Sequence, residues 1–306
     1  MKHEHTGAGE MSATLDGSVA SRVKALEFRA ERAVRSLRAG MHRSRDQGSS
    51  TVFSEHRPYR PGDDLRRLDW RAYARSGKPV VRRFEQEAQL RATLVLDDSA
   101  SMNWPAPDTA DHKGDAAVTL LAAAALLLLE QGDAVRLLRL SDREPAPYSS
   151  GRSALPAILR RLSEPFQAMG EAPAMPLGAQ LQRTSDGSAL IVASDFLDVL
   201  DAPIPWRTLV TRAPRVVAFQ VLHKGELEPD AREARFVACE DDAFIEADFE
   251  RVREGYTSAL QAFCNTLRSD AQLAGASLRL ARSDEDPVLV LASAFGSGVA
   301  MRTERH

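Results

Sequence analysis

Two acidic residues and two serines directly follow a strongly apolar segment in the first third of the chain. The stretch TLVLDDSASMNW, residues 93–104, leads from apolar residues into Asp97, Asp98, Ser99 and Ser101. Three kinds of site begin this way: the nucleophilic aspartate of a phosphotransferase, the acidic strand of a nucleotide-hydrolysing motor, and an oxygen-ligand site for a hard cation. The rest of the sequence must decide among them.

Two of these three chemistries lack a part that they need. A phosphotransferase of the haloacid dehalogenase type uses a second aspartate, two residues after the nucleophile, as acid and base. That position holds Ser99, a poor proton donor near neutral pH. A P-loop ATPase needs the pattern GxxxxGK[ST], which does not occur here, since the Gly77-Lys78 pair is followed by Pro79. A metal-dependent phosphohydrolase that uses Asp97 stays open as an alternative.

The third chemistry is a cation site with the pattern Asp-x-Ser-x-Ser. Asp97 offers a carboxylate, and Ser99 and Ser101 offer hydroxyls from alternate positions of one loop. Asp195 follows the apolar run LIVAS and offers a second carboxylate. A set of oxygen ligands suits Mg²⁺ or Mn²⁺. The alternative is that these side chains only cap a helix and close turns.

The elements that must position these residues alternate along the sequence from residue 92 onward. Apolar runs predict strands, and amphipathic patterns predict the helices between them. Such alternation predicts an α/β fold over residues 91–306: a doubly wound, mostly parallel sheet with helices on both faces. Ligands bind such sheets at the carboxyl ends of the strands, where Asp97 and Asp195 both lie. The predicted strands are 92–96, 134–140, 188–194, 215–222 and 277–281, with EPAPYSS as an edge strand, and the predicted helices are 113–131, 153–163, 176–185, 201–212 and 248–274.

The first ninety residues have a different character. Residues 1–18 contain no apolar segment, so we expect a disordered tail and no signal peptide. Residues 19–39 predict an amphipathic helix. After it, β-prone pieces at 51–53 and 80–84 alternate with turn residues and predict a small β-containing module. We group residues 19–90 as an N-terminal helix plus a basic β/loop module.

Composition and charge narrow the class of protein. Cys239 and Cys264 stand alone in the sequence, which fits a reducing compartment. The apolar run at 116–129 is shorter than the roughly 20 residues that cross a bilayer, so we expect a cytoplasmic protein without a membrane span. Residues 20–90 carry 17 Lys/Arg against 9 Asp/Glu, and residues 91–306 carry 22 against 31. The basic segment can pair with the acidic part of the chain, or bind an acidic protein, nucleic acid or a phospholipid surface. Few aromatic residues lie among its basic ones, which disfavours nucleic acid.

Three stretches resemble known families. LVLDDSASM and LIVASDFLD resemble the strand ends of a von Willebrand factor A-type domain with its metal-ion-dependent adhesion site. The segment FSEHRPYRPGDDLRRLDWRAYARSGKPVVRRFEQE resembles the signature of the bacterial domain-of-unknown-function family 58. We expect this Arg/Asp-rich signature to hold the small module together through ion pairs, or to bind a partner. The residues that match it are Arg57, Tyr59, Pro61, Gly62, Asp63, Asp64, Asp69, Trp70 and Arg75.

The resemblance implies a function and one departure from the family pattern. It implies a non-enzymatic assembly factor that works with a MoxR-type AAA+ ATPase in the maturation of a client complex, or in metal insertion into it; methanol dehydrogenase is one such client. It also implies a threonine ligand on a second loop, but the matching stretch APAMPLGAQL has Met175 there. A thioether is a poor ligand for a hard cation. We therefore expect Mg²⁺ or Mn²⁺ binding to be weak or absent.

Overall fold

The chain forms two compact units, which are described separately. The structure is a computed structural model of all 306 residues. One unit comprises residues 40–89, and the other comprises residues 1–39 together with 90–306. In the smaller unit, β1 (His56–Pro58) pairs antiparallel with β2 (Val80–Arg82). The structure describes residues 20–38, 56–59, 73–75, 77–82, 89–105, 111–168, 175–184, 186–200, 202–229, 233–237 and 244–295.

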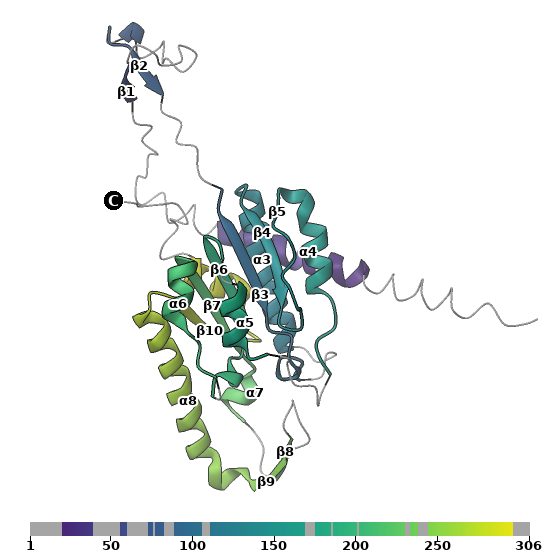
Figure 1. Cartoon of the computed structure of the whole chain (residues 1–306). Coiled ribbons are helices and arrows are strands. Elements are labelled where there is room, and N and C mark those ends of the chain that lie inside the picture. Colours follow the sequence, from purple (N-terminus) through teal and green to yellow (C-terminus); the bar gives the residue numbers. More distant parts are fainter. Residues whose placement is uncertain are drawn as a thin grey trace, which may run out of the picture. The chain divides into compact units, whose positions relative to one another are not determined.

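A six-stranded sheet forms the centre of the larger unit (Figure 1). Its strand order is β10-β7-β6-β3-β4-β5, and every neighbouring pair is parallel except β4 and β5. The short antiparallel β5 lies at the edge, within the proline-containing stretch predicted as an edge strand. The predicted α/β fold with a mostly parallel sheet is confirmed. The strands are β3 (Arg91–Leu96), β4 (Ala134–Arg139), β5 (Ser149–Ser150), β6 (Ala189–Ser194), β7 (Arg215–Leu222) and β10 (Ser277–Arg282).

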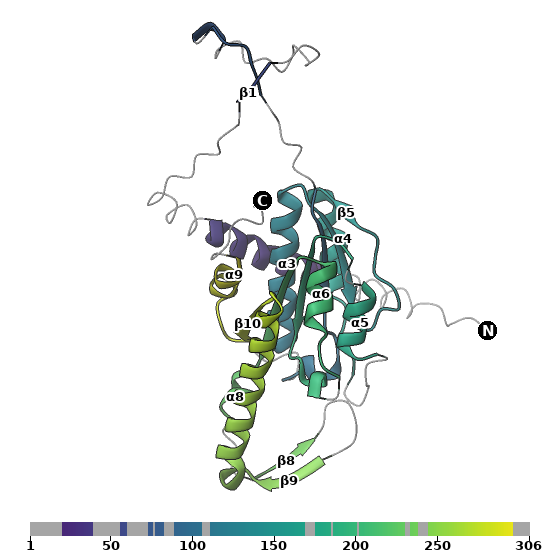
Figure 2. The ribbon, with the colours of Figure 1, turned by 60° about the vertical axis from the view of Figure 1, so that its left-hand side comes forward.

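Helices cover both faces of this sheet (Figure 2). Phe219 of β7 contacts Phe295 of α9 (Pro287–Phe295), with 6.3 Å between ring centroids. Its neighbour Ala218 belongs instead to a buried cluster with residues of α5 (Leu177–Thr184), α6 (Trp206–Arg212) and α8 (Phe249–Leu273). Because successive side chains of a strand point to opposite faces, α9 lies on one face and the other three helices lie on the other. α3 (Lys113–Glu130) contacts α9 and α4 (Leu155–Leu162), and so shares their side.

The helix over residues 20–38 belongs to the unit of the sheet. Its apolar stripe is buried, while Arg29 reaches Asp115 near the start of α3 and Arg38 reaches Glu130 at its end. α3 is apolar almost all round, which is typical of a helix that is covered on every side. The sequence analysis grouped this helix with residues 40–90, but the helix belongs to the α/β unit and buries its apolar face there. The buried stripe is Leu26, Ala30, Ala33, Val34 and Leu37.

Several short elements complete the larger unit. The helix predicted from residue 201 begins at Trp206, because Pro203 and Pro205 precede it. The sequence did not predict α9, α7 or the antiparallel pair β8–β9, and the β-prone piece 51–53 lies outside the described residues.

No helix in the described part of the chain is both long and apolar enough to cross a membrane. The remaining elements are η2 (Ala100–Met102), η3 (Arg152–Ala154), η4 (Leu197–Leu200), α7 (Lys224–Leu227), β8 (Glu233–Val237) and β9 (Phe244–Asp248).

Candidate functional site

Asp97 and Asp195 lie at adjacent carboxyl ends in the middle of the sheet. β3 and β6 are neighbours, and the chain leaves them toward opposite sides: from β3 through α3 to β4, and from β6 through α6 to β7. This is the topological switch point of a doubly wound sheet, where such folds bind ligands. The backbone N–H of Asp97 donates to the carbonyl of Ala193 at 3.0 Å, which ties the two strand ends together.

The Asp97 carboxylate is buried and has a donor on each oxygen. Its Oδ1 accepts the backbone N–H of Ser99 at 3.0 Å, and its Oδ2 accepts the hydroxyl of Ser194 at 2.6 Å. Only 3% of Asp97 is exposed. Burial, together with the charge of Asp195, raises the pKa of Asp97 to about 7, although the hydrogen bonds from the two serines oppose the shift. Near neutral pH, this carboxyl is therefore divided between its protonated and its ionised form.

Ser99 and Ser101 bond to one another in the loop after β3. Their hydroxyl oxygens lie 3.1 Å apart, and both residues are buried. Ser101 belongs to η2, which follows Ser99 directly. Each serine therefore has a hydroxyl partner within the same loop, as expected for side chains that close a turn.

Asp195 is paired with a buried lysine that comes from the start of α3. The Lys113 ammonium lies 2.8 Å from Oδ2 of Asp195 and 2.7 Å from Oε1 of Glu226, and its side chain is 0% exposed. The other Asp195 oxygen accepts the backbone N–H of Leu197 at 3.1 Å. Burial by itself lowers the pKa of Lys113, but the charges of Asp195 and Glu226 outweigh burial and hold that pKa above its ordinary value.

Glu226 reaches Lys113 from the first turn of α7. Its second oxygen accepts the backbone N–H of His223 at 2.7 Å, and the His223 ring accepts the N–H of Gly225, which together form a capping box. The short helix after β7 thus holds Glu226 in place. Lys113 therefore connects the ends of three elements: β6, α7 and α3.

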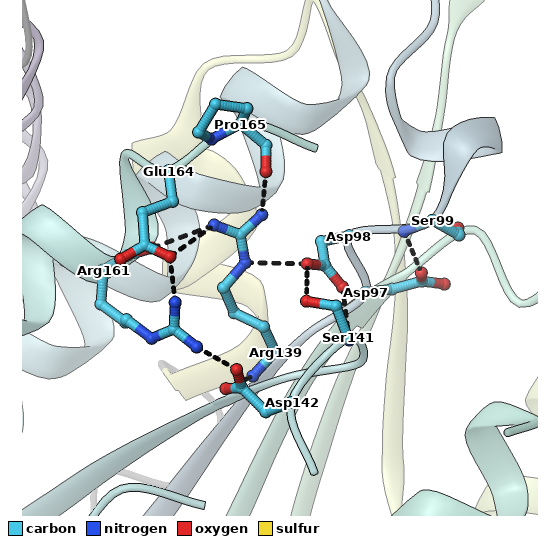
Figure 3. A network of polar contacts seen from close by, with 9 residues as sticks. All are labelled: Asp97, Asp98, Ser99, Arg139, Ser141, Asp142, Arg161, Glu164 and Pro165. Carbon is cyan, nitrogen blue, oxygen red and sulfur yellow. Dashed lines mark hydrogen bonds and ion pairs between the residues drawn. The ribbon is translucent and has the colours of Figure 1, made fainter. Parts of the chain in front are cut away.

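Asp98 turns away from Asp97 and pairs with Arg139, the last residue of β4 (Figure 3). Arg139 Nε donates to Asp98 Oδ2 at 2.9 Å, and both side chains are 2% exposed. Ser141 donates its backbone N–H and its hydroxyl to the same carboxylate. The rest of the guanidinium donates to the carbonyl of Arg161 in the last turn of α4 and to that of Pro165 after this helix. Asp98 and Arg139 therefore neutralise one another inside the protein.

The structure places only part of the Arg/Asp-rich signature. Tyr59 is half-buried and its N–H donates to the carbonyl of Pro79 at 2.9 Å. Arg75 is exposed, and Arg57 lies in β1. Six residues of this signature lie outside the described residues: Pro61, Gly62, Asp63, Asp64, Asp69 and Trp70.

The predicted metal ligands come together, but each of their oxygens already has a partner within the protein. Both carboxylates already accept two donors each, and the two serine hydroxyls bond to each other. Met175 lies beside Arg183, whose Nη1 is 3.9 Å from its sulfur. Within the described ranges, no three His, Cys, Asp or Glu side chains are grouped to hold a metal ion. A divalent ion at Asp195 would also meet the positive charge of Lys113.

Sequence reasoning missed Lys113, Glu226 and Arg139. Two of them do leave a signal in the sequence. Arg139 interrupts the apolar run AVRLLRL near the carboxyl end of a strand, where a charge needs a partner. Lys113 is the first residue of a long apolar helix, at the end where the helix dipole disfavours a cation. The partners could not be read from the sequence, because Lys113 is 82 residues from Asp195 and 113 from Glu226.

Comparison with known proteins identifies the family. The family described as "Protein of unknown function DUF58" matches residues 55–263. The chain belongs to this family. It is 28% identical, over 284 residues, to the uncharacterized proteins Rv1480 of Mycobacterium tuberculosis (strain ATCC 25618 / H37Rv) and Mb1516 of Mycobacterium bovis. The match covers 89% of this chain and 87% of each of these DUF58 relatives.

A solved structure is also similar to this DUF58 chain. It is an uncharacterized membrane spanning protein from Vibrio fischeri, with 18% sequence identity and a TM-score of 0.21. The match covers 70% of this chain and 99% of that one. A TM-score this low supports no inference about fold or function.

Proposed function

We propose that this protein is a non-enzymatic assembly factor that acts in the cytoplasm by binding other proteins. Its partners in this proposal are a MoxR-type AAA+ ATPase and a client complex, as the family resemblance implies. The ATPase supplies the nucleotide hydrolysis, and the DUF58 chain connects it with the client during maturation or metal insertion.

The observation that carries the proposal is the internal pairing of the carboxylates at the strand ends. Asp97 and Asp195 are at most 3% exposed, and each has donors on both oxygens. Asp98 is bound to Arg139. A nucleophile or general base must reach its substrate. Carboxylates held in this way stabilise the loops between the elements and are poorly placed for catalysis.

Exposed apolar side chains on α8 give further support. Val252 is 45% exposed and Tyr256 is 37% exposed, both in the N-terminal half of the helix. The C-terminal half carries Leu267 and Ala271 into the core beside the sheet. The hydroxyl of Tyr256 donates to the carbonyl of Glu226 at 2.8 Å, so in this proposal the partner covers Val252 and the ring of Tyr256.

Affinity capture from native lysate tests this proposal. The tagged chain is incubated with lysate of the source organism in the presence of ATP, and the bound proteins are identified by mass spectrometry. We expect an AAA+ ATPase of the MoxR type to be enriched over a tagged control of the same size. An experiment without any enriched ATPase would count against the proposed partner.

A second assay addresses the enzymatic alternative. The pure chain is incubated with generic phosphate esters and Mg²⁺, in parallel with Asp97→Asn. We expect no turnover by either protein. Turnover by the wild type that disappears in Asp97→Asn would replace the proposal with a phosphohydrolase.

A further inference from the structure

The ammonium of Lys113 lies where a positive charge is electrostatically costly. Lys113 is the first residue of α3, where the helix dipole repels positive charge, and its side chain is 0% exposed. A buried ammonium is kept only if close opposite charges and hydrogen bonds compensate for its lost hydration. Asp195 and Glu226 provide that compensation at 2.8 and 2.7 Å.

The carboxylates around Lys113 outnumber its single charge. Asp195 and Glu226 contact it directly, and the charge of Asp195 also acts on Asp97. Without the ammonium, Asp195 and Glu226 would keep their backbone N–H donors but would lie close together without a compensating positive charge. Two neighbouring carboxylates such as Asp195 and Glu226 offer the oxygen ligands that a hard divalent cation prefers, with water completing its shell. In this chain the ammonium satisfies the same charges.

We propose that the Lys113 ammonium is the resident cation of the strand-end site and excludes divalent metal from it. The ammonium donates to a carboxylate at the end of β6 and to one in α7, and so joins these elements to the start of α3, as a bound metal ion would. The wild-type site is therefore independent of metal. Removing the charge of Lys113 exposes a latent site for Mg²⁺ or Mn²⁺ at Asp195 and Glu226.

The test compares wild type with Lys113→Ala in metal-free buffer containing EDTA and in buffer containing Mg²⁺ or Mn²⁺. Wild type should have the same melting temperature in all these buffers. Lys113→Ala should melt at a lower temperature in EDTA, and Mn²⁺ should restore part of the loss. By calorimetric titration, the variant should bind Mn²⁺ about tenfold more tightly than wild type or better, which corresponds to about 1.4 kcal/mol.

Two controls make the result specific to this site. Lys224→Ala removes a neighbouring cation that pairs with Asp111 at 3.2 Å and is 53% exposed, so it should not create Mn²⁺ binding. Lys113→Ala combined with Asp195→Asn should lose the gained binding. A folded Lys113→Ala that binds Mn²⁺ no better than wild type would overturn the inference.

A measurement on the wild type keeps the inference testable if Lys113→Ala does not fold. Reductive methylation followed by mass spectrometry should leave Lys113 unmodified while Lys224 reacts, with the same pattern in EDTA and in Mn²⁺. Binding of Mn²⁺ to the wild type that Asp195→Asn abolishes would show that the metal and not the ammonium occupies the site. That result would overturn the inference without bearing on the proposed binding of an ATPase.

Discussion

At the scale of single residues, the strand-end site is a set of buried charges that is nearly balanced from within. Lys113 and Arg139 each compensate carboxylates that approach from other elements. Asp97 is the exception, because its partners are hydroxyl and amide groups and not a cation. The raised pKa of Asp97 follows from this difference. The unbalanced carboxyl gives the protein a pH dependence that can be measured.

Asp97→Asn should remove a pH dependence of stability. The pKa of Asp97 is raised from 3.8 to about 7, so folding takes up a proton between these values. The stabilising contribution of the protonated carboxyl is complete below pH 3.8 and is lost as the pH rises to about 7. Relative to the wild type, the variant should therefore gain in free energy of unfolding as the pH rises, up to about pH 7. Urea unfolding of both proteins over this pH interval measures the difference. If the two free energies of unfolding change with pH in parallel, the prediction is wrong.

The Asp98–Arg139 pair should show strong coupling. Arg139→Met leaves Asp98 buried and charged without its partner, which should lower the free energy of unfolding by about 3–5 kcal/mol. Asp98→Asn should also lower the free energy of unfolding. The double variant should lose less free energy of unfolding than the two single variants together. Urea unfolding of the four proteins gives the coupling energy.

Arg161→Met is the matched control for this cycle. Arg161 makes ion pairs with Asp142 and Glu164, but it is 39% exposed. Its loss should cost no more than about 1 kcal/mol, because exposed ion pairs contribute little. Equal losses for Arg139→Met and Arg161→Met would mean that burial does not set the strength of the pair.

At the scale of elements, the sequence predicted the strands of the sheet better than the segments between them. The strand at 91–96 was predicted at 92–96, and the strand at 215–222 was predicted with its observed bounds, because buried parallel strands are continuous apolar runs. The switch-point rule then placed Asp97 and Asp195 side by side. α9 escaped prediction because its apolar run of nine residues has no periodicity that separates helix from strand. The ion pairs of the site depend on contacts between distant segments, which a single sequence does not show.

The helix over residues 20–38 should contribute to the stability of the α/β unit. Leu26 on its inner face is 1% exposed, whereas Phe28 on its outer face is 66% exposed. Leu26→Ala should lower the free energy of unfolding by about 2–5 kcal/mol. Phe28→Ala should change it by no more than about 0.5 kcal/mol. Urea unfolding compares the two, and equal effects would show that the helix does not pack on the core in solution.

At the scale of the whole molecule, the inside and the surface of the α/β unit differ in what they can bind. The strand ends, where related folds place their ligands, are closed by internal charge pairs. In the proposed function, partners would bind the outer surface, where α8 exposes Val252 and Tyr256. This division is what the proposal of an assembly factor that acts through contacts with other proteins requires.

The measurement that tests this account most directly is sedimentation velocity of the purified chain mixed with the purified MoxR-type AAA+ ATPase of the same organism. With a non-hydrolysable ATP analogue bound to the ATPase, we predict a single faster-sedimenting complex. The complex should form equally with Asp97→Asn, because Asp97 has no catalytic task in this account. Two independent boundaries in every nucleotide state would contradict it.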